Sequence, residues 1–184
     1  MPSLLAALFL ASLTLAAAGG ACGKVPSMAP SLTPSPLPPP SPCSAFVDGA
    51  IITLFAADFG YWSLDNYLAL ATDVPTSLTV LSTSSGTFAL HDDVPNYFGI
   101  LIDPSAFTNL VIPYNDASTP ETSFACVDVG DNCVALRDMN GNFVRPCPSC
   151  VPENDAMTPY LACTPPVNGQ PTTAHAWTVN VPAP

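Results

Sequence analysis

The residue types that most often perform chemistry gather at few places in this sequence. His91-Asp92-Asp93 is the densest polar cluster, and two neighbouring carboxylates are the pair that general acid–base catalysis uses. Adjacent residues of a strand point to opposite faces, and Pro95 follows closely, so the pattern favours a turn. His175 has no Glu-x-x-His partner and no Gly-x-Ser-x-Gly elbow to serve. The sequence therefore predicts no catalytic residues, and we expect the protein not to be an enzyme.

Seven cysteines in a chain of 184 residues indicate an oxidising compartment, where disulfides persist. Six of them fall in the part of the chain that we expect to fold, and six cysteines allow fifteen pairings. We predict that these six form disulfides without choosing the pairing: Cys43, Cys126, Cys133, Cys147, Cys150 and Cys163. The seventh, Cys22, would pair with Cys43 or bridge two chains.

Two segments suggest a metal or redox site, and each has a simpler explanation. Cys147-Pro148-Ser149-Cys150 has the spacing of a redox pair or, with Cys133 and Cys163, of a structural zinc site. A redox pair normally opens a helix, which the Pro-rich surroundings disfavour. Asp138-Met139-Asn140-Gly141-Asn142 is similar to a calcium loop, but Phe143 stands where an EF-hand loop needs Gly. With no Gly-rich phosphate loop present, we predict neither a metal nor a cofactor.

The charge balance excludes several classes of partner. The chain has 14 acidic and 3 basic residues, a net charge of -11. Beyond residue 24 only Arg137 and Arg145 are basic, too few to neutralise a phosphate backbone. We therefore expect no nucleic-acid partner and no anionic membrane surface.

The first 43 residues differ in composition from the rest. Residues 1–21 contain a short apolar run that ends in small residues, which predicts a secretory signal peptide. Residues 22–43 are rich in Pro and Ser and predict a disordered, extended spacer. Its Ser-Pro and Pro-Pro steps resemble the hydroxyproline-rich modules of plant and green-algal wall glycoproteins. We expect a secreted protein with no membrane segment in its mature form, and the cell wall is one expected location.

Residues 44–184 predict an all-β domain, because short apolar runs are broken by turn residues about every ten positions. The segment 61–72 is ambiguous, since Leu64, Leu68 and Ala71 also have helical spacing. We favour a hairpin with Asp65-Asn66 as its turn.

Three segments of this domain, 52–64, 88–100 and 134–146, share one plan. Each has an apolar strand that reaches a leucine, then a polar or Gly-rich turn, then a returning aromatic. The leucines are Leu54, Leu90 and Leu136, and the aromatics are Tyr61, Tyr97 and Phe143. A further strand follows each copy, at 77–82, 109–114 and 176–182.

Three units of about 40 residues, each with about four strands, predict a β-trefoil rather than an ordinary sandwich. The expected units are 44–83, 84–122 and 123–184. One unit cannot bury its apolar face alone, whereas three around a pseudo-threefold axis close a barrel. The leucines and the returning aromatics are expected to form its core.

The third copy, 133–144, resembles the repeat of the fascin-like and amaranthin-type agglutinin β-trefoils. The positions that carry the resemblance are Ala135, Leu136, Asn140, Gly141 and Phe143. The resemblance implies a trefoil fold and a lectin-like function.

A trefoil offers three similar shallow sites, and acidic, amide and aromatic side chains suit sugar hydroxyls and rings. We predict a secreted carbohydrate-binding module whose partner is a glycan or cell-wall polysaccharide. The candidate ligand-binding residues are Asp58, Trp62 and Asp65 in the first unit, Asp92, Asn96 and Tyr97 in the second, and Asp138, Asn140 and Asn142 in the third. The alternatives are a structural wall or matrix protein with an inert trefoil and a protein-binding trefoil of the inhibitor kind.

Overall fold

A computed structural model describes residues 40–65, 68–83, 86–92, 96–101, 109–150 and 158–182. The predicted signal peptide, Cys22 and the spacer up to residue 39 lie outside these residues. In the described part of the chain no helix is both long and apolar enough to cross a membrane.

The described residues form twelve strands and three short 3-10 turns. The strands are β1 (Ile51–Ala56), β2 (Gly60–Asp65), β3 (Leu68–Thr72), β4 (Leu78–Ser82), β5 (Phe88–His91), β6 (Tyr97–Leu101), β7 (Asn109–Tyr114), β8 (Ala125–Gly130), β9 (Cys133–Arg137), β10 (Phe143–Pro146), β11 (Leu161–Thr164) and β12 (Trp177–Asn180). The 3-10 turns are η1 (Pro42–Ala45), η2 (Pro120–Thr122) and η3 (Thr173–His175). The prediction of an all-β domain is confirmed.

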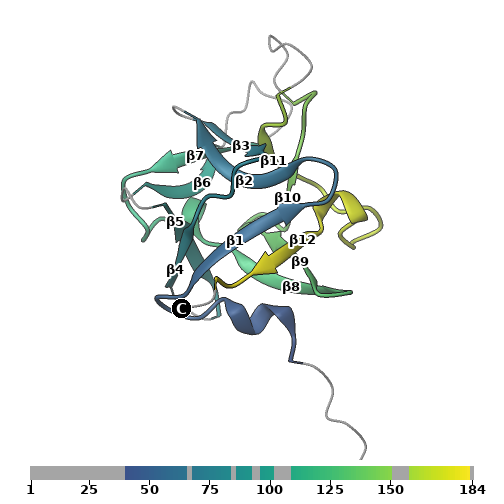
Figure 1. Ribbon diagram of the computed structural model, residues 1–184. Coiled ribbons are helices and arrows are strands. Elements are labelled where there is room, and N and C mark those ends of the chain that lie inside the picture. Colours follow the sequence, from purple (N-terminus) through teal and green to yellow (C-terminus); the bar gives the residue numbers. More distant parts are fainter. Residues whose placement is uncertain are drawn as a thin grey trace, which may run out of the picture. The chain divides into compact units, whose positions relative to one another are not determined.

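Six of the strands close into a barrel. β1 pairs with β4 and β12, β4 pairs with β5, and β9 pairs with β8 and β12, all antiparallel. Two backbone hydrogen bonds between Phe88 and Phe124, of 2.8 and 2.9 Å, join β5 to the start of β8 and complete the ring. Figure 1 shows the last strand, β12, lying beside β1. A closed ring leaves no unpaired edge, which removes the usual route to strand aggregation.

The other six strands form three antiparallel hairpins, β2–β3, β6–β7 and β10–β11. The hairpins contact one another, because β11 pairs with β7 and an isolated bridge joins Leu70 to Tyr160. The predicted hairpin over 61–72 is confirmed. Its strands pair Asp65 with Leu68, so the connection is residues 66–67, one position later than predicted.

This arrangement of a six-stranded barrel and three hairpins, built from three four-strand repeats, is a β-trefoil. The repeats are β1–β4, β5–β8 and β9–β12. One predicted unit boundary needs correction. The strand over 109–114 is β7, a hairpin strand, whereas the strand that closes the second repeat is β8. The second repeat therefore runs on to the turn at 131–132, beyond the predicted boundary at 122.

The core repeats with the trefoil symmetry. Leu54, Leu90 and Leu136 are fully buried, as predicted. The predicted core aromatics are offset by one residue in two repeats, since Tyr61 and Tyr97 are half-buried and their successors Trp62 and Phe98 are fully buried. In the third repeat both Phe143 and its successor Val144 are buried. Adjacent strand residues face opposite sides, so only one of each neighbouring pair of the first two repeats enters the barrel.

Trp62 is, with Trp177, one of the two largest fully buried side chains of this core. Its ring meets Phe98 edge-on with centroids 5.3 Å apart and lies 5.5 Å from the ring of Trp177. The Trp177 indole N–H donates to the Val144 carbonyl oxygen at 3.1 Å. Such aromatic contacts add to the burial of large apolar surfaces, so the three repeats are held together at their centre.

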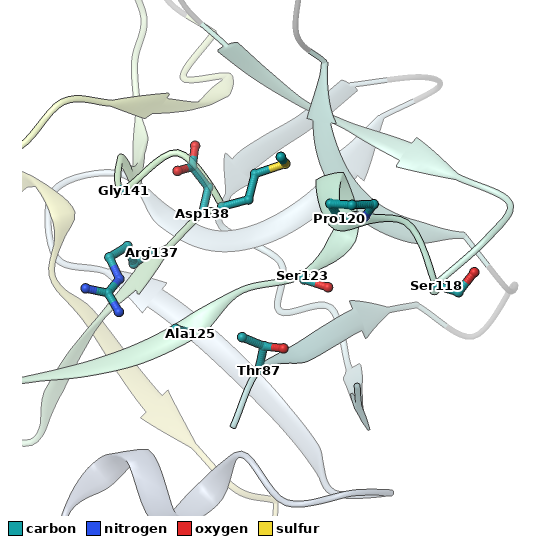
Figure 2. Close-up of a pocket in the computed structure, with 9 residues that line it drawn as sticks. Thr87, Ser118, Pro120, Ser123, Ala125, Arg137, Asp138 and Gly141 are labelled. Atoms are coloured by element: carbon teal, nitrogen blue, oxygen red, sulfur yellow. The ribbon is translucent and has the colours of Figure 1, made fainter. Parts of the chain in front are cut away.

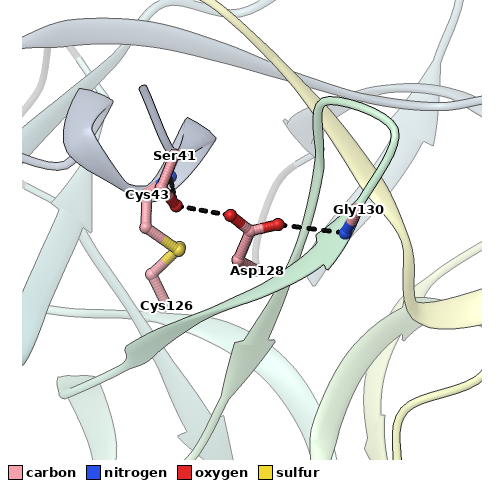
Figure 3. The surroundings of a disulfide bond; sticks show 5 residues. All are labelled: Ser41, Cys43, Cys126, Asp128 and Gly130. Carbon is pink, nitrogen blue, oxygen red and sulfur yellow. Dashed lines mark hydrogen bonds between the residues drawn. A yellow bond between two sulfur atoms is a disulfide. The ribbon is translucent and has the colours of Figure 1, made fainter. Parts of the chain in front are cut away.

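One disulfide joins Cys43 to Cys126 across 83 positions of sequence and fixes η1 to β8 (Figure 3). Beside it the Ser41 hydroxyl and the Gly130 backbone N–H both donate to the Asp128 carboxylate. These donors lower the pKa of Asp128, with Ser41 contributing most. Cys43, which we placed in the spacer, is therefore tied to the folded domain.

The second disulfide joins Cys147 to Cys150, so neither sulfur is a thiolate that could bind zinc. The prediction of disulfides is wrong for Cys133 and Cys163, which are free thiols. Cys163 is buried, and burial, followed by the charge and hydrogen bond of Asp138, raises the pKa of its thiol well above the usual value. It packs in the core as a neutral thiol, which behaves as a small apolar group.

Candidate binding site

A polar hollow of the described surface lies between the second and third repeats. This polar depression, of about 550 Å³, is lined by Thr87, Ser118, Pro120, Ser123, Ala125, Arg137, Asp138, Met139 and Gly141 (Figure 2). Its volume falls within the range of about 300–1,000 Å³ that is usual for small-ligand sites. One wall is the β9–β10 turn, and the other is the connection that leads through η2 into β8.

Asp138 shapes the first wall. Its Oδ1 accepts hydrogen bonds from the backbone N–H groups of Asn140 at 2.9 Å and Asn142 at 2.8 Å, and its Oδ2 accepts from the Asn142 amide at 3.4 Å. Gly141 takes a φ of 83° in this turn, a conformation that suits glycine. The carboxylate points toward the Gly141 turn in Figure 2, away from Thr87 and Ser123. Asp138 therefore stabilises the turn and leaves the other side chains to face a ligand.

Hydroxyl groups dominate the second wall. The Ser118 N–H and hydroxyl both donate to the Asp116 carboxylate at 2.7 Å, and these bonds lower the pKa of Asp116. The buried Thr122 hydroxyl bonds the carbonyl oxygens of Ala117 and Thr119 at 2.9 Å. These contacts hold the connection that carries Ser118 and Ser123. A fixed hydroxyl can donate or accept, and it needs little reordering when a polar ligand binds.

Arg137 supplies the charge of the polar depression. It is the last residue of β9, and its backbone lies opposite Ala125 on one side and Phe143 on the other. Its side chain is exposed. Figure 2 shows it at the other end of the depression from Ser118. A guanidinium is always protonated and presents a planar fork of donors, so this end of the depression carries a positive charge beside the Asp138 carboxylate.

A second hollow lies at the corresponding place one repeat away. This apolar depression, of about 230 Å³, is lined by Ala56, Ala57, Asp58, Phe59, Cys133, Thr173, Ala174, Ala176 and Thr178. Aligning Leu54 with Leu136 places Ala57 at the position of Met139. Aligning η3 with η2 places Ala176 at that of Ser123. The two depressions are therefore built from the same parts of the fold with different side chains.

His175 supports the wall of the apolar depression from inside. It is 3% exposed, its Nε2 lies 2.8 Å from the Thr164 hydroxyl, and its Nδ1 accepts the Thr172 N–H at 2.9 Å. Burial and then the charge of Arg145 lower the pKa of His175, partly opposed by the Thr172 hydrogen bond. The imidazole is thus neutral and structural, which agrees with the absence of a catalytic motif around it in the sequence.

The candidates of the first repeat do not come together. Trp62 is fully buried and cannot stack on a sugar, so its placement in a binding site is wrong. Asp58 lies in the exposed β1–β2 turn beside the apolar depression. Asp65 ends β2 at the far end of that strand, and its side chain is not among those that the structure describes.

The candidates of the second repeat meet at the β5–β6 connection. The Tyr97 ring is half-buried and meets the His91 ring edge-on with centroids 5.3 Å apart. Asn96 is half-buried, and Asp92 Oδ1 is buried with no hydrogen-bond partner among the described residues. Residues 93–95 lie outside the described chain, so a binding role for this cluster stays a prediction.

The candidates of the third repeat meet in the turn beside the polar depression. Asp138 borders the polar depression, but its oxygens are occupied by its own turn, as described above. Asn142 donates to that carboxylate, and Asn140 is exposed beside it. Sequence reasoning missed Arg137, Met139 and the hydroxyls of Thr87, Ser118 and Ser123. Arg137 left a signal, because it is one of only two basic residues beyond position 24.

The described residues contain no group of three or more His, Cys, Asp or Glu side chains placed to hold a metal ion. In the segment 138–142 the Asp138 carboxylate accepts hydrogen bonds from Asn140 and Asn142. This arrangement can bind polar ligands through hydroxyl groups and one cation.

Comparison with known proteins identifies the class of fold. No protein-family model matches the chain, and no curated protein matches its sequence. The designed threefold-symmetric protein ThreeFoil has 12% identity and a TM-score of 0.55, over 72% of this chain and 99% of that one. A Macrolepiota procera ricin B-like lectin, solved with lactose, has 14% identity and a TM-score of 0.53, over 74% and 98%. A Culex salivary protein of the Cysteine and Tryptophan-Rich family has 11% identity and a TM-score of 0.53, over 73% and 95%.

At these identities the likeness shows the fold alone. The chain has the β-trefoil fold that it shares with lectins and a designed symmetric protein, and the resemblance to amaranthin-type and fascin-like repeats finds no family-level match.

Proposed function

We propose that this protein is a secreted, lectin-like, non-enzymatic trefoil that binds a glycan or cell-wall polysaccharide in the polar depression. The observation that carries the proposal is the lining of that hollow, which combines the hydroxyl residues Thr87, Ser118 and Ser123 with the exposed Arg137. Sugars are recognised by such convergent hydroxyl, amide and charged groups.

Apolar contacts complete the expected recognition. Met139 is 50% exposed, and it borders the depression together with Pro120 and Ala125. A pyranose ring has one face of C–H groups, which would pack on these side chains, while its hydroxyls bond the serines. Met supplies adaptable apolar surface of this kind. This mode differs from the predicted one, because it uses no aromatic platform.

The disulfides and the fold support an extracellular location. The Cys43–Cys126 and Cys147–Cys150 bonds are typical of proteins matured in an oxidising compartment. The predicted signal peptide would direct the chain there. The ricin B-like lectin that shares the fold was solved with lactose, which supports a saccharide as the ligand.

A structural wall or matrix module is the second candidate. It is favoured by the burial of Trp62, which removes the strongest aromatic binding residue from the surface. It is also favoured by the Cys43–Cys126 bond, which fixes the start of the domain where the Pro-rich segment ends. An inert, stapled trefoil displayed on a spacer would need no depression.

A glycan and cell-wall polysaccharide array separates the two candidates. Ser123→Leu fills the polar depression, and Ala176→Leu makes the matched change in the apolar one. Both residues have extended backbones, with φ and ψ of -94° and 123° at Ser123 and -83° and 127° at Ala176. We expect saturable binding by the unmodified protein and Ala176→Leu, and its loss in a folded Ser123→Leu. Binding to nothing on the array would favour the structural candidate.

A further inference from the structure

We infer that the saccharide bound in the polar depression carries a single anionic group, a uronic acid carboxylate, held by Arg137. This inference rests on the proposed function and adds the chemical class of the ligand. A neutral glycan would offer the guanidinium only single, uncharged acceptors, whereas a carboxylate matches its two parallel donors and its charge.

Three carboxylates of the domain accept hydrogen bonds from donors other than Arg137. Asp116 accepts from Ser118, Asp128 accepts from Ser41 and Gly130, and Asp138 accepts from Asn140 and Asn142. Arg137 is exposed at the rim of the depression, with its backbone pinned between β8 and β10. Its side chain is therefore an exposed cation on a fixed backbone, in a protein where cations are scarce.

The opposite end of the polar depression suits the rest of a sugar. The Ser118 hydroxyl donates its proton to Asp116 and keeps lone pairs that can accept from a ligand hydroxyl. The Thr87 hydroxyl lies 2.6 Å from that of Thr83 and is held in place. A uronic acid has its carboxylate on one side of the ring and hydroxyls on the other. This polarity matches a hollow with a guanidinium at one end and hydroxyls at the other.

The protein's charge limits the ligand to few anionic groups. A net charge of -11 repels a polyanion over distances up to the Debye length of about 8 Å at physiological ionic strength. One guanidinium offsets one carboxylate, and it cannot offset a run of them. We therefore expect preference for a saccharide with an isolated uronic acid over a homopolymer of uronic acids.

The trefoil symmetry limits the number of such sites. In the apolar depression the position of Arg137 is taken by Phe55, which packs on Tyr61 with ring centroids 4.9 Å apart. Ser123 and Thr87 are replaced there by Ala176 and Cys133. The apolar depression thus lacks both the cation and two of the hydroxyls. Of these two depressions, we expect only the polar one to bind an acidic sugar.

Isothermal titration with a matched pair of ligands tests the inference. The probes are a disaccharide of one uronic acid and one neutral sugar, and the same disaccharide with its carboxyl reduced to an alcohol. A sulfated disaccharide is a third arm. The variants are Arg137→Gln and Asn132→Asp, which each change the net charge by one unit in the negative direction. Asn132 is exposed at the β8–β9 turn and does not line the polar depression.

We expect the acidic disaccharide to bind about 10- to 100-fold more tightly than its reduced form, as a charge-assisted, bidentate contact implies. Arg137→Gln should remove that difference, and Asn132→Asp should keep it. Equal binding of both forms, unchanged in Arg137→Gln, would overturn the inference and leave the proposed function standing. Binding of neither form, nor of any neutral glycan, would overturn the proposed function itself. Tighter, Arg137-dependent binding of the sulfated sugar would overturn the assignment of a carboxylate.

Discussion

The polar and apolar depressions occupy corresponding places in the trefoil, and they differ in nearly every side chain that lines them. The polar depression lies between the β9–β10 turn and the connection from η2 to β8. The apolar depression lies between the β1–β2 turn and the connection from η3 to β12. Arg137 and Ser123 line the polar depression. The residues at the corresponding positions are Phe55, which is not among the lining residues of the apolar depression, and Ala176, which is.

The two turns join the same positions of their repeats, Leu54 to Tyr61 and Leu136 to Phe143, by different means. In the third repeat the Asp138 carboxylate bonds the turn through its side chain. In the first repeat Ala56 stands at that position, the Phe59 N–H bonds the Ala56 carbonyl oxygen at 3.1 Å, and Gly60 takes a φ of 103°. The backbone plan is thus shared across repeats, whereas the side chains that a ligand would meet are free to differ.

The largest expected effect comes from a substitution in the barrel core, at a residue that lines neither depression. Trp62→Ala takes a fully buried indole out of the barrel and should lower the free energy of unfolding by about 3–5 kcal/mol. Urea denaturation followed by tryptophan fluorescence measures it. Tyr61→Ala, at the half-buried neighbour, is the control and should cost less. A loss below about 1 kcal/mol for Trp62→Ala would contradict a core built on that ring.

Glycine substitutions separate the two turns. A Cβ at Gly60 would overlap the Thr72 carbonyl oxygen, whereas a Cβ at Gly141 meets nothing within 4 Å. Both residues have positive φ, so each alanine costs about 1 kcal/mol for the backbone alone. Gly60→Ala adds overpacking and should cost about 1–3 kcal/mol more than Gly141→Ala. Thermal denaturation compares them, and equal costs would contradict the close approach of β2 to β3.

Substitution of one carboxylate in each turn tests whether side-chain hydrogen bonds stabilise the β9–β10 turn and not the β1–β2 turn. Asp138→Ala leaves the N–H groups of Asn140 and Asn142 without their acceptor and should cost about 1–3 kcal/mol. Asp58→Ala, in the corresponding turn of the first repeat, removes an exposed side chain and should change stability by less than about 0.5 kcal/mol. Urea denaturation of both variants measures the difference. Similar costs would show that the two turns are held in the same way.

The smallest effect is a dependence on pH that belongs to the wall of the apolar depression. His175 is buried with a lowered pKa, while in the unfolded chain it titrates near 6.5. The unfolded state therefore binds more protons below that pH, so stability should fall as the pH drops below about 6.5. In the wall of the polar depression Thr122 occupies the corresponding 3-10 turn and does not titrate.

The free energy of unfolding between pH 8 and pH 5 tests this expectation. His175→Gln should show a shallower loss of stability across that range than the unmodified protein. A slope that the substitution does not change would show that His175 does not contribute.

The sequence predicted the fold well because the trefoil repeats its apolar pattern. Leu54, Leu90 and Leu136 were enough to align three copies and to identify the core leucines. The same pattern does not tell which of two adjacent aromatics faces inward, so Tyr61 was predicted for the core and Trp62 for the surface. Strand alternation fixes that choice only once the register is known.

The candidate site was harder to predict because its residues come from three separate parts of the chain. Thr87, the stretch around Ser118–Ser123, and Arg137 meet only after β5, β8 and β9 join the barrel. The cysteine pairing had the same difficulty, since Cys43 and Cys126 are 83 positions apart. Local patterns predicted the turn at Asp138. This turn borders the site, but the hydroxyl groups that line it come from other segments.

Backbone amide NMR of the protein with a bound glycan tests directly whether the saccharide lies in the polar depression. The ligand is the saccharide with the strongest array signal, titrated into the unmodified protein. The account predicts shifts centred on Thr87, Ser118, Ser123 and Met139, with little change at Cys133 and Ala176. Shifts centred on the apolar depression or on the β5–β6 connection, or no saturable shifts with any arrayed glycan, would contradict it.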